Sequence, residues 1–287
     1  MRHLALFTCL LPLALAAPGT AQDRLFRAED QAGRRAATAQ LLDVLRSRPD
    51  QPTTVALAAT AAVQLAEGSA AKTQLVAALQ RANATATTHD SLARLRRELG
   101  DVVETLAFRP RIEAELPEGF PGPVTVDEIE LRDYPAYRMV RTAMRGGSFS
   151  AFWPLFRHIE SNGIAMTAPV QMDWQEQDER SRPVQMAFLY GDPKIEPAQV
   201  AKGVEVVAVE AMTVLSIGAI GDDRRDRVEA MHERLRTFLA APDCAYEACG
   251  PLRTMGYNSP MVPKDQRYFE VQLPVRKRAA AAVSGLR

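Results

Sequence analysis

The C-terminal half of the chain carries the same order of predicted elements twice, and this repeat limits the possible folds more than any other feature. Alternating apolar residues predict strands, and 3.6-residue spacing predicts helices. The first copy has strands at 124–132 and 136–144, a helix at 148–160, and strands at 164–174 and 183–190. The second has strands at 204–210 and 212–220, a helix at 222–240, and strands at 252–257 and 268–275. The repeat predicts an α+β domain in which antiparallel strands form a distorted barrel with two helices and an internal two-fold relation.

Both predicted helices are amphipathic. The apolar stripe of the first consists of Phe149, Phe152, Trp153, Phe156 and Ile159, and that of the second of Val228, Met231, Leu235, Phe238 and Leu239. Each stripe is expected to pack against the sheet. A cleft between the two halves is then the first place to look for a ligand.

The N-terminal part differs in composition. Residues 22–108 are rich in Ala, Leu, Arg and Gln with helical spacing of the apolar positions, which predicts an all-α region of four helices. Residues 109–123 contain four prolines and two glycines and are predicted to form an extended linker. The barrel is expected over 124–276, followed by a flexible tail at 277–287. No catalytic motif lies in the helical region, which we interpret as a spacer or as a docking unit for a protein partner.

The first 21 residues have the pattern of a signal peptide. Arg2 and His3 precede an apolar run at 4–17, and Ala21 provides a small residue for cleavage before Gln22. Pro12 interrupts the run, which is too short for a bilayer-spanning helix. The sequence predicts an exported protein without an integral membrane span.

Two cysteines, Cys244 and Cys249, remain after the predicted signal peptide. In an oxidising compartment they are expected to form a disulfide, with two free thiols as the alternative. Zinc is not expected, because no second cysteine pair or histidine motif accompanies them.

The charge pattern and the motifs exclude several functions. The formal net charge is zero, and no basic stripe marks a nucleic-acid site. Phosphate-binding loops, zinc-protease motifs and nucleophile elbows are missing from the sequence. The chain is therefore interpreted as a small-molecule-binding protein rather than as an enzyme.

One segment resembles a known family. Residues 152–172 read FWPLFRHIESNGIAMTAPVQM, which is similar to the signature of the SOUL/heme-binding family, an aromatic helix followed by an Ile-Ala-Met-Thr-Ala-Pro-Val strand. Residues 134–137 and 257–275 resemble the family's opening strand and closing hairpin, with Glu270 at the position of the family's Glu. The resemblance covers 124–276 and implies non-covalent binding of heme or another tetrapyrrole in an apolar groove beside a helix.

Four large side chains are candidates for lining such a groove, namely Trp153, Phe156, Met166 and Met172. Aromatic rings stack on flat ligands and methionine adapts to them. The same side chains could equally belong to the hydrophobic core.

Two histidines are candidates for contact with heme. His158 lies roughly 180° from Phe149 on a helical wheel, so it is expected to face away from the core, exposed to solvent or acting as an iron ligand on the outer helix surface. His232 lies within about 40° of Val228, which places it either in the core or in a pocket.

A second functional class comes from the last strand, which also resembles that of gyrase-inhibitor-like effector-binding domains. Strand alternation puts Tyr268, Glu270 and Gln272 on one face. A buried Glu270 would select cationic aromatic ligands, and the resemblance implies weak hydrolysis as the one enzymatic alternative. The other alternative is a polar row that faces solvent.

Overall fold

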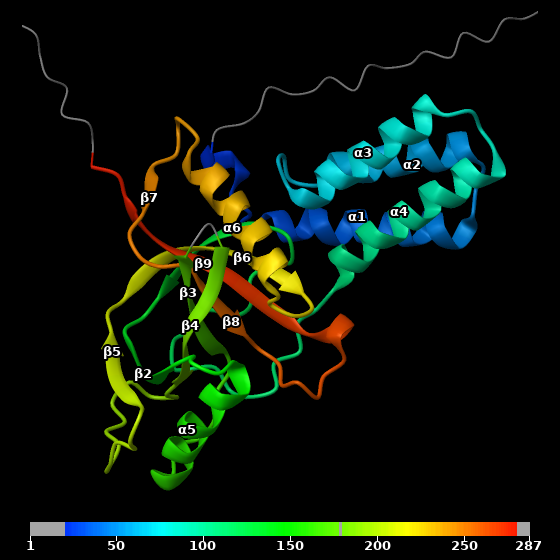
Figure 1. The fold of residues 1–287 in the computed structure, drawn as a ribbon. Coiled ribbons are helices and arrows are strands. Elements are labelled where there is room, and N and C mark those ends of the chain that lie inside the picture. The colour runs from blue at the N-terminus through cyan, green and yellow to red at the C-terminus, as the bar shows by residue number, and fades with distance from the viewer. Residues whose placement is uncertain (1–20, 178–179, 280–287) are drawn as a thin grey trace, which may run out of the picture.

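The computed structural model describes residues 21–177 and 180–279 (Figure 1). Residues 1–20 of the predicted signal peptide and the tail from residue 280 lie outside this part. Within the described residues, no helix has the length and apolar character needed to cross a membrane.

Four α-helices form an N-terminal bundle, as the sequence predicts. They are α1 (Asp30–Ser47), α2 (Gln51–Gln64), α3 (Ala70–Ala84) and α4 (His89–Ala107), after a short 3-10 helix, η1 (Ala21–Arg24). The turns fall where capping residues stand: the side chains of Asp50, Ser69 and Thr88 accept backbone hydrogen bonds at the starts of α2, α3 and α4. Leucines from α1, α3 and α4 fill the core of the bundle.

The second half is an open, curled antiparallel sheet with two helices, which confirms the predicted α+β class. Its strands are β1 (Ile129–Tyr134), β2 (Tyr137–Ala143), β3 (Val170–Gln177), β4 (Arg180–Leu189), β5 (Glu205–Val209), β6 (Met212–Ile220), β7 (Tyr246–Ala248), β8 (Arg253–Gly256) and β9 (Tyr268–Lys277). The helices are α5 (Ser148–Ser161), α6 (Arg225–Leu239) and the short η2 (Lys264–Gln266). The strand order is β1-β6-β9-β8-β3-β4-β2-β5, with β7 paired to β9. The sheet is therefore a half-barrel with β1 and β5 at its edges.

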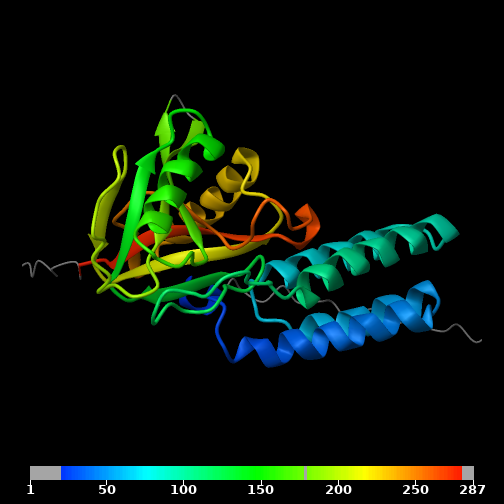
Figure 2. The same cartoon turned by 90° about the horizontal axis from the view of Figure 1, so that it is seen from below.

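The helices cover one face of this sheet. The α6 helix packs on β6 and β9 through Val228 and Leu235 against Leu215 and Val271, and α5 packs on β2 and β4. A segment that we call the strap, residues 108–126, covers the opposite face (Figure 2). The predicted linker, 109–123, belongs to this strap and packs on the sheet.

The strap packs closely on that face. Phe108, Ile112 and Leu116 belong to a cluster around Tyr257 and Tyr268. Further along the strap, the ring of Phe120 meets those of Tyr134 and Tyr137 edge-on, with centroids 5.0 and 5.2 Å apart.

The bundle is attached to the half-barrel by specific contacts. Arg34 of α1 donates from Nη1 to Glu128, 3.0 Å away, and both side chains are only 4% exposed. The amide of Phe26 donates to the carbonyl of Ile129. Ala21, at the end of the predicted signal peptide, is buried in the core beneath α6, and its amide donates to Asp243. These contacts place the bundle at the β1 edge of the sheet.

Candidate functional site

The face of α5 that meets the sheet differs from the predicted stripe. Phe149 is 74% exposed and Trp153 is 44% exposed, whereas Ala151 and Leu155 are buried. The helix is rotated relative to the prediction because the small Ala151 and Leu155, four residues apart, form a second apolar row that packs on the sheet.

Two predicted groove residues lie near this helix surface, and two lie deeper. Phe156 is half-buried and contacts the ring of Trp153, with centroids 5.9 Å apart. Met166 and Met172 are half-buried and pack against the cluster beneath α5. Met166 also lines a cavity of about 410 Å³ between the strap and the loop at 165–167.

His158 corrects a prediction. The helical spacing predicts a position outside the core, but the side chain is completely buried, and its Nε2 lies 2.8 Å from the hydroxyl of Tyr190. Burial lowers the pKa of His158 and raises the pKa of Tyr190 to about 12, so both groups are neutral near pH 7. The error arose because the helical wheel was referred to Phe149, which is exposed. His158 is therefore neither solvent-exposed nor on the outer helix surface, where it was expected to bind iron.

Glu270 is fully buried on the face of the sheet that the strap covers. Its carboxylate accepts hydrogen bonds from Val124 N (2.9 Å), Tyr257 OH (3.0 Å), Tyr268 OH (3.1 Å), Ser216 Oγ (3.1 Å) and Gln272 Nε2 (2.7 Å). The predicted alternation of Tyr268, Glu270 and Gln272 on one face is confirmed, and the alternative of a solvent-facing row is wrong. Burial and the neighbouring Glu270 raise the pKa of Tyr257 and Tyr268, which remain donors.

The polar layer around Glu270 continues through Gln272. Its Oε1 accepts from Nε of Arg253, 2.9 Å away, and Arg253 Nη1 donates to the hydroxyl of Tyr137. The strap closes over the layer, since the single hydroxyl proton of Tyr268 is shared between Glu270 and the carbonyl of Val124, which lies 2.5 Å from the hydroxyl. The space beside the carboxylate is therefore occupied by the chain itself.

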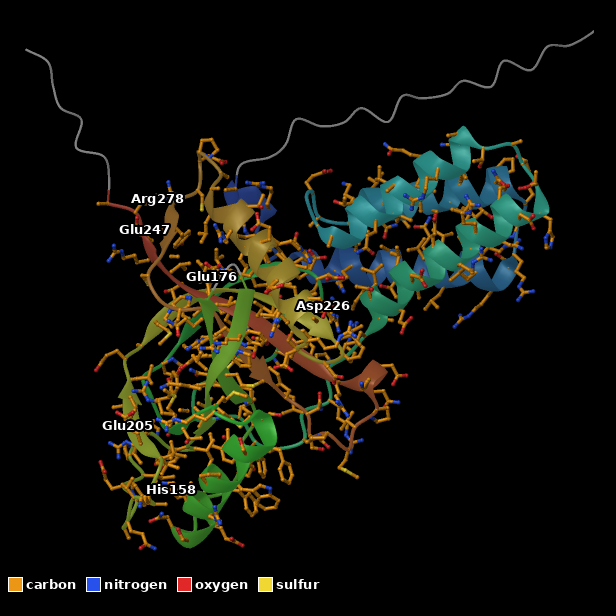
Figure 3. All side chains as sticks on the ribbon, viewed as in Figure 1. His158, Glu176, Glu205, Asp226, Glu247 and Arg278 are labelled. Atoms are coloured by element: carbon orange, nitrogen blue, oxygen red, sulfur yellow. The ribbon has the colours of Figure 1, made fainter. Side chains whose placement is uncertain are left out.

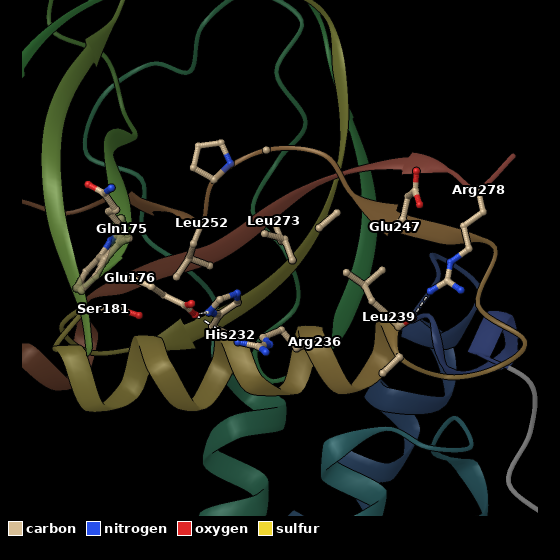
Figure 4. A pocket seen from close by; sticks show the side chains of 15 residues that line it. Gln175, Glu176, Ser181, His232, Arg236, Leu239, Glu247, Leu252, Leu273 and Arg278 are labelled. Carbon is tan, nitrogen blue, oxygen red and sulfur yellow. Dashed lines mark hydrogen bonds and ion pairs between the residues drawn. The ribbon is translucent and has the colours of Figure 1, made fainter. Parts of the chain in front are cut away.

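A groove of about 680 Å³ lies between α6, the β3–β4 hairpin and β7 (Figure 4). We call it the α6 groove. Its apolar floor consists of Trp174, Leu239, Leu252 and Leu273. The ring nitrogen of Trp174 donates to Thr254, which fixes the indole within the sheet layer. The groove thus has a preformed apolar surface between secondary-structure elements.

His232 lies at this groove, as one of its two predicted positions required. Its side chain is 13% exposed, and its Nδ1 lies 3.8 Å from Glu176 Oε1. Arg236, one turn further along α6, is 3.3 Å from the same oxygen. Burial lowers the pKa of His232 and outweighs the opposing effect of Glu176, so the imidazole is neutral near pH 7.

Arg278 closes the other end of the groove. Its Nη2 donates to the carbonyl of Leu239, 2.7 Å away, and its Nε donates to that of Tyr246. Among the residues that the structure describes, no carboxylate forms an ion pair with Arg278, whereas neighbouring Glu247 pairs with Arg276 at 2.7 Å. The groove can therefore offer a guanidinium group to an anion.

The seven predicted site residues do not form one site. Trp153 and Phe156 lie on α5, and Met166 and Met172 pack in the cluster beneath it. His158 is in the core, His232 lines the α6 groove, and Glu270 lies on the opposite face of the sheet. Figure 3 shows His158 far from Glu176, Glu247 and Arg278. Sequence reasoning missed Trp174 and Arg236, and it assigned Arg278 to a flexible tail. Their only sequence signal is the period of β3 and α6, which does not reveal that they share a groove.

Comparison with solved structures found matches of low sequence identity. The EcmrR C-terminal domain is 14% identical, with a TM-score of 0.43 over 53% of this chain and 98% of that chain. A hydrolase from Listeria innocua is 11% identical, with a TM-score of 0.37 over 52% of this chain and 91% of that one. SAV2435, solved with tetraphenylphosphonium, is 12% identical, with a TM-score of 0.34 over 52% of this chain and 94% of that chain.

The sequence itself gives a more definite assignment. No curated protein matches the chain. The family model described as SOUL heme-binding protein matches residues 123–274, more than half of the chain. This range includes the whole curled sheet except the end of β9, together with α5 and α6. The chain therefore belongs to the SOUL heme-binding protein family.

Proposed function

We propose that this protein is an exported tetrapyrrole-binding protein and that the α6 groove holds heme. The observation that carries the proposal is the combination of His232, Arg236 and Arg278 with an apolar floor in one groove. Family membership supports a heme-like ligand. Export is supported by the signal-peptide pattern of residues 1–21.

The dimensions and lining of the groove suit a flat, largely apolar molecule. Its volume of about 680 Å³ is within the range of small-molecule sites, roughly 300–1,000 Å³. Trp174 and Leu252 offer apolar surface on one side. Polar groups line the two ends and the α6 side, where His232 and Arg236 lie. A porphyrin likewise combines apolar and polar parts, since it has an apolar ring and two carboxylates on one edge.

His232 is the residue of the groove that could bind the iron of heme. Its lowered pKa keeps the imidazole unprotonated, which leaves a lone pair for a metal. Glu176 lies on the Nδ1 side of the ring. A carboxylate there favours the tautomer that carries its proton on Nδ1, which leaves the lone pair of Nε2 free to bind a metal. When heme is bound, its iron supplies the Lewis acid that this nitrogen would meet.

Arg236 and Arg278 would hold the carboxylates of the ligand. Arg278 is already oriented by two backbone carbonyls and lacks an acidic partner in the described part of the chain. Arg236 is 58% exposed and already forms ion pairs with Glu176 and Glu233, so its contribution is expected to be smaller.

Titration of the mature protein with hemin and with iron-free protoporphyrin tests the proposal. His232→Ala should weaken hemin binding about tenfold to a hundredfold and shift the Soret band, because only iron senses the missing nitrogen. Protoporphyrin binding should be unchanged. Arg278→Gln should weaken both ligands about threefold to tenfold. His89→Ala, at a 96% exposed side chain on the bundle, is the matched control and should change neither.

A different pattern of losses would contradict the assignment. If Trp153→Ser removes porphyrin affinity while His232→Ala and Arg278→Gln do not, the ligand binds at α5, as the sequence pattern suggested. If the wild-type protein binds neither ligand with saturation, tetrapyrrole binding itself is wrong. Detection of the chain only in the cytosolic fraction of the producing cell would contradict export.

A further inference from the structure

The exposed side of α5 carries a stripe of aromatic and basic residues. Phe149, Trp153 and Arg157 are four residues apart, so they lie in one row along the helix. All three are exposed. Phe149 and Trp153 are the only exposed large aromatic residues in the described part of the chain; the others of comparable exposure are Leu57, Val63, Val200 and Met261. We call the row the α5 stripe.

The rings of the α5 stripe are held in place from below. Trp153 meets Phe149 edge-on at 5.8 Å and Phe152 at 5.7 Å. Phe152 in turn contacts Phe188 of the sheet at 5.2 Å. The exposed rings are therefore supported by the core, and presenting them to a partner requires no rearrangement of the helix.

From Arg138 to Arg157 every charged side chain is an arginine, and the next acidic side chain, Glu160, lies at the C-terminal end of α5. Residues 135–159 contain no Asp or Glu. Two arginines of β2, Arg138 and Arg141, are paired with glutamates from other segments. Arg145, just before α5, and Arg157, within it, are exposed and form no ion pair with any described residue. Two unpaired guanidinium groups thus flank the two exposed rings.

We propose that the α5 stripe docks the protein on an anionic phospholipid surface. Trp and Phe side chains partition to the headgroup region, and each nearby arginine adds about 1 kcal/mol of attraction to anionic lipid. Figure 1 shows α5 at the end of the half-barrel remote from the bundle, where a flat surface can approach it. The stripe lies apart from the α6 groove, so docking leaves the groove accessible.

Co-sedimentation with vesicles tests this docking. One set contains phosphatidylcholine with about one-third phosphatidylglycerol, and the other contains phosphatidylcholine alone. The wild-type protein should bind the anionic vesicles, and high salt should weaken binding. Phe149→Ser with Trp153→Ser should reduce the partition coefficient at least about tenfold. Arg145→Gln with Arg157→Gln should abolish the preference for anionic lipid.

Val63→Ser is the matched control, because Val63 is 78% exposed and apolar but lies on the bundle. It should bind vesicles as the wild type does. Thermal unfolding of each variant confirms that the fold persists, which is expected since the substituted side chains are exposed. Equal binding to both vesicle types, or unchanged binding of the aromatic double variant, would overturn the proposal. So would sedimentation analysis showing that the α5 stripe pairs two copies of the protein and that vesicles do not compete.

Discussion

Replacing Glu128 should show how strongly the bundle is attached to the half-barrel. Glu128 and Arg34 form a buried ion pair, in which Glu128 Oε1 lies 3.0 Å from Arg34 Nη1. The pair joins α1 to the segment before β1. Arg34 also donates to the carbonyls of Thr105 and Val126. The pair therefore connects the bundle, the strap and the sheet at one point.

Glu128→Ala leaves the guanidinium group of Arg34 buried without its carboxylate. Removing one partner of a buried pair costs about 3–5 kcal/mol. Arg34 keeps its two backbone acceptors, so we expect the lower end, about 3 kcal/mol, measured by urea unfolding at pH 8. Glu98→Ala is the control, because Glu98 pairs with Arg81 at an exposed position of the bundle. It should cost less than about 1 kcal/mol.

The same pair should make stability depend on pH. Burial raises the pKa of Glu128 from 4.5 to about 7, even though Arg34 acts in the opposite direction. Between these values the folded state binds the proton more tightly than the unfolded state does. The free energy of unfolding contributed by Glu128 should therefore fall as pH rises from about 4.5 to 7, with a slope of at most about 1.4 kcal/mol per pH unit. Glu128→Gln should remove this slope.

Two results would refute this reasoning. A loss below about 1 kcal/mol in Glu128→Ala would mean that water reaches Arg34 and that the bundle is not held there. An unchanged pH slope in Glu128→Gln would mean that another group titrates. Arg34→Met combined with Glu128→Leu should recover most of the loss, since a buried pair can be replaced by apolar packing.

Three further predictions concern the cysteines, the strap and the buried histidine. The expected disulfide is not formed, since Cys244 is a buried free thiol and Cys249 an exposed one. A thiol reagent should therefore label Cys249 in the native protein and both cysteines only after unfolding. A mass two hydrogens lower would contradict this. A chain beginning near Pro117 lacks the whole bundle and half of the strap, so it should expose the cluster around Tyr268 and be insoluble. A soluble product that unfolds cooperatively would show that the first half of the strap is dispensable. Tyr190→Phe removes the hydrogen-bond partner of His158 and should cost about 1–3 kcal/mol in thermal unfolding, whereas a change near zero would mean that water replaces the hydroxyl.

Much of the fold could be predicted because its signals are local. The two amphipathic helices and the flanking alternating segments define the repeat without any tertiary information. The strand predicted from residue 164 instead begins at Val170, after Pro169, which has no amide to donate. The three-residue β7 was missed because it exists only through its pairing with β9. The strap was recognised as extended, but sequence patterns do not reveal which surface an extended segment covers.

The candidate site was harder to predict because it depends on which side of each helix meets the sheet. Val228, used as the reference for His232, is fully buried, and the prediction for His232 includes its observed position. Phe149, used for His158, is exposed, and the same reasoning failed there. On α5 two apolar rows compete, and only the shape of the sheet decides between them. Arg278 reaches the α6 groove because β9 extends to Lys277, beyond the predicted end of the domain.

The position of Glu270 argues against an effector-type pocket on its face of the sheet. No basic side chain in the described ranges pairs with Glu270, and its hydrogen-bonding capacity is satisfied by hydroxyl and amide donors. A cationic ligand would have to displace Val124 and expose the apolar side of the strap, including Phe120. Because α4 leads directly into the strap, that movement would also pull on the bundle. Glu270 therefore anchors the strap, whereas the α6 groove, where we propose that the ligand binds, is open.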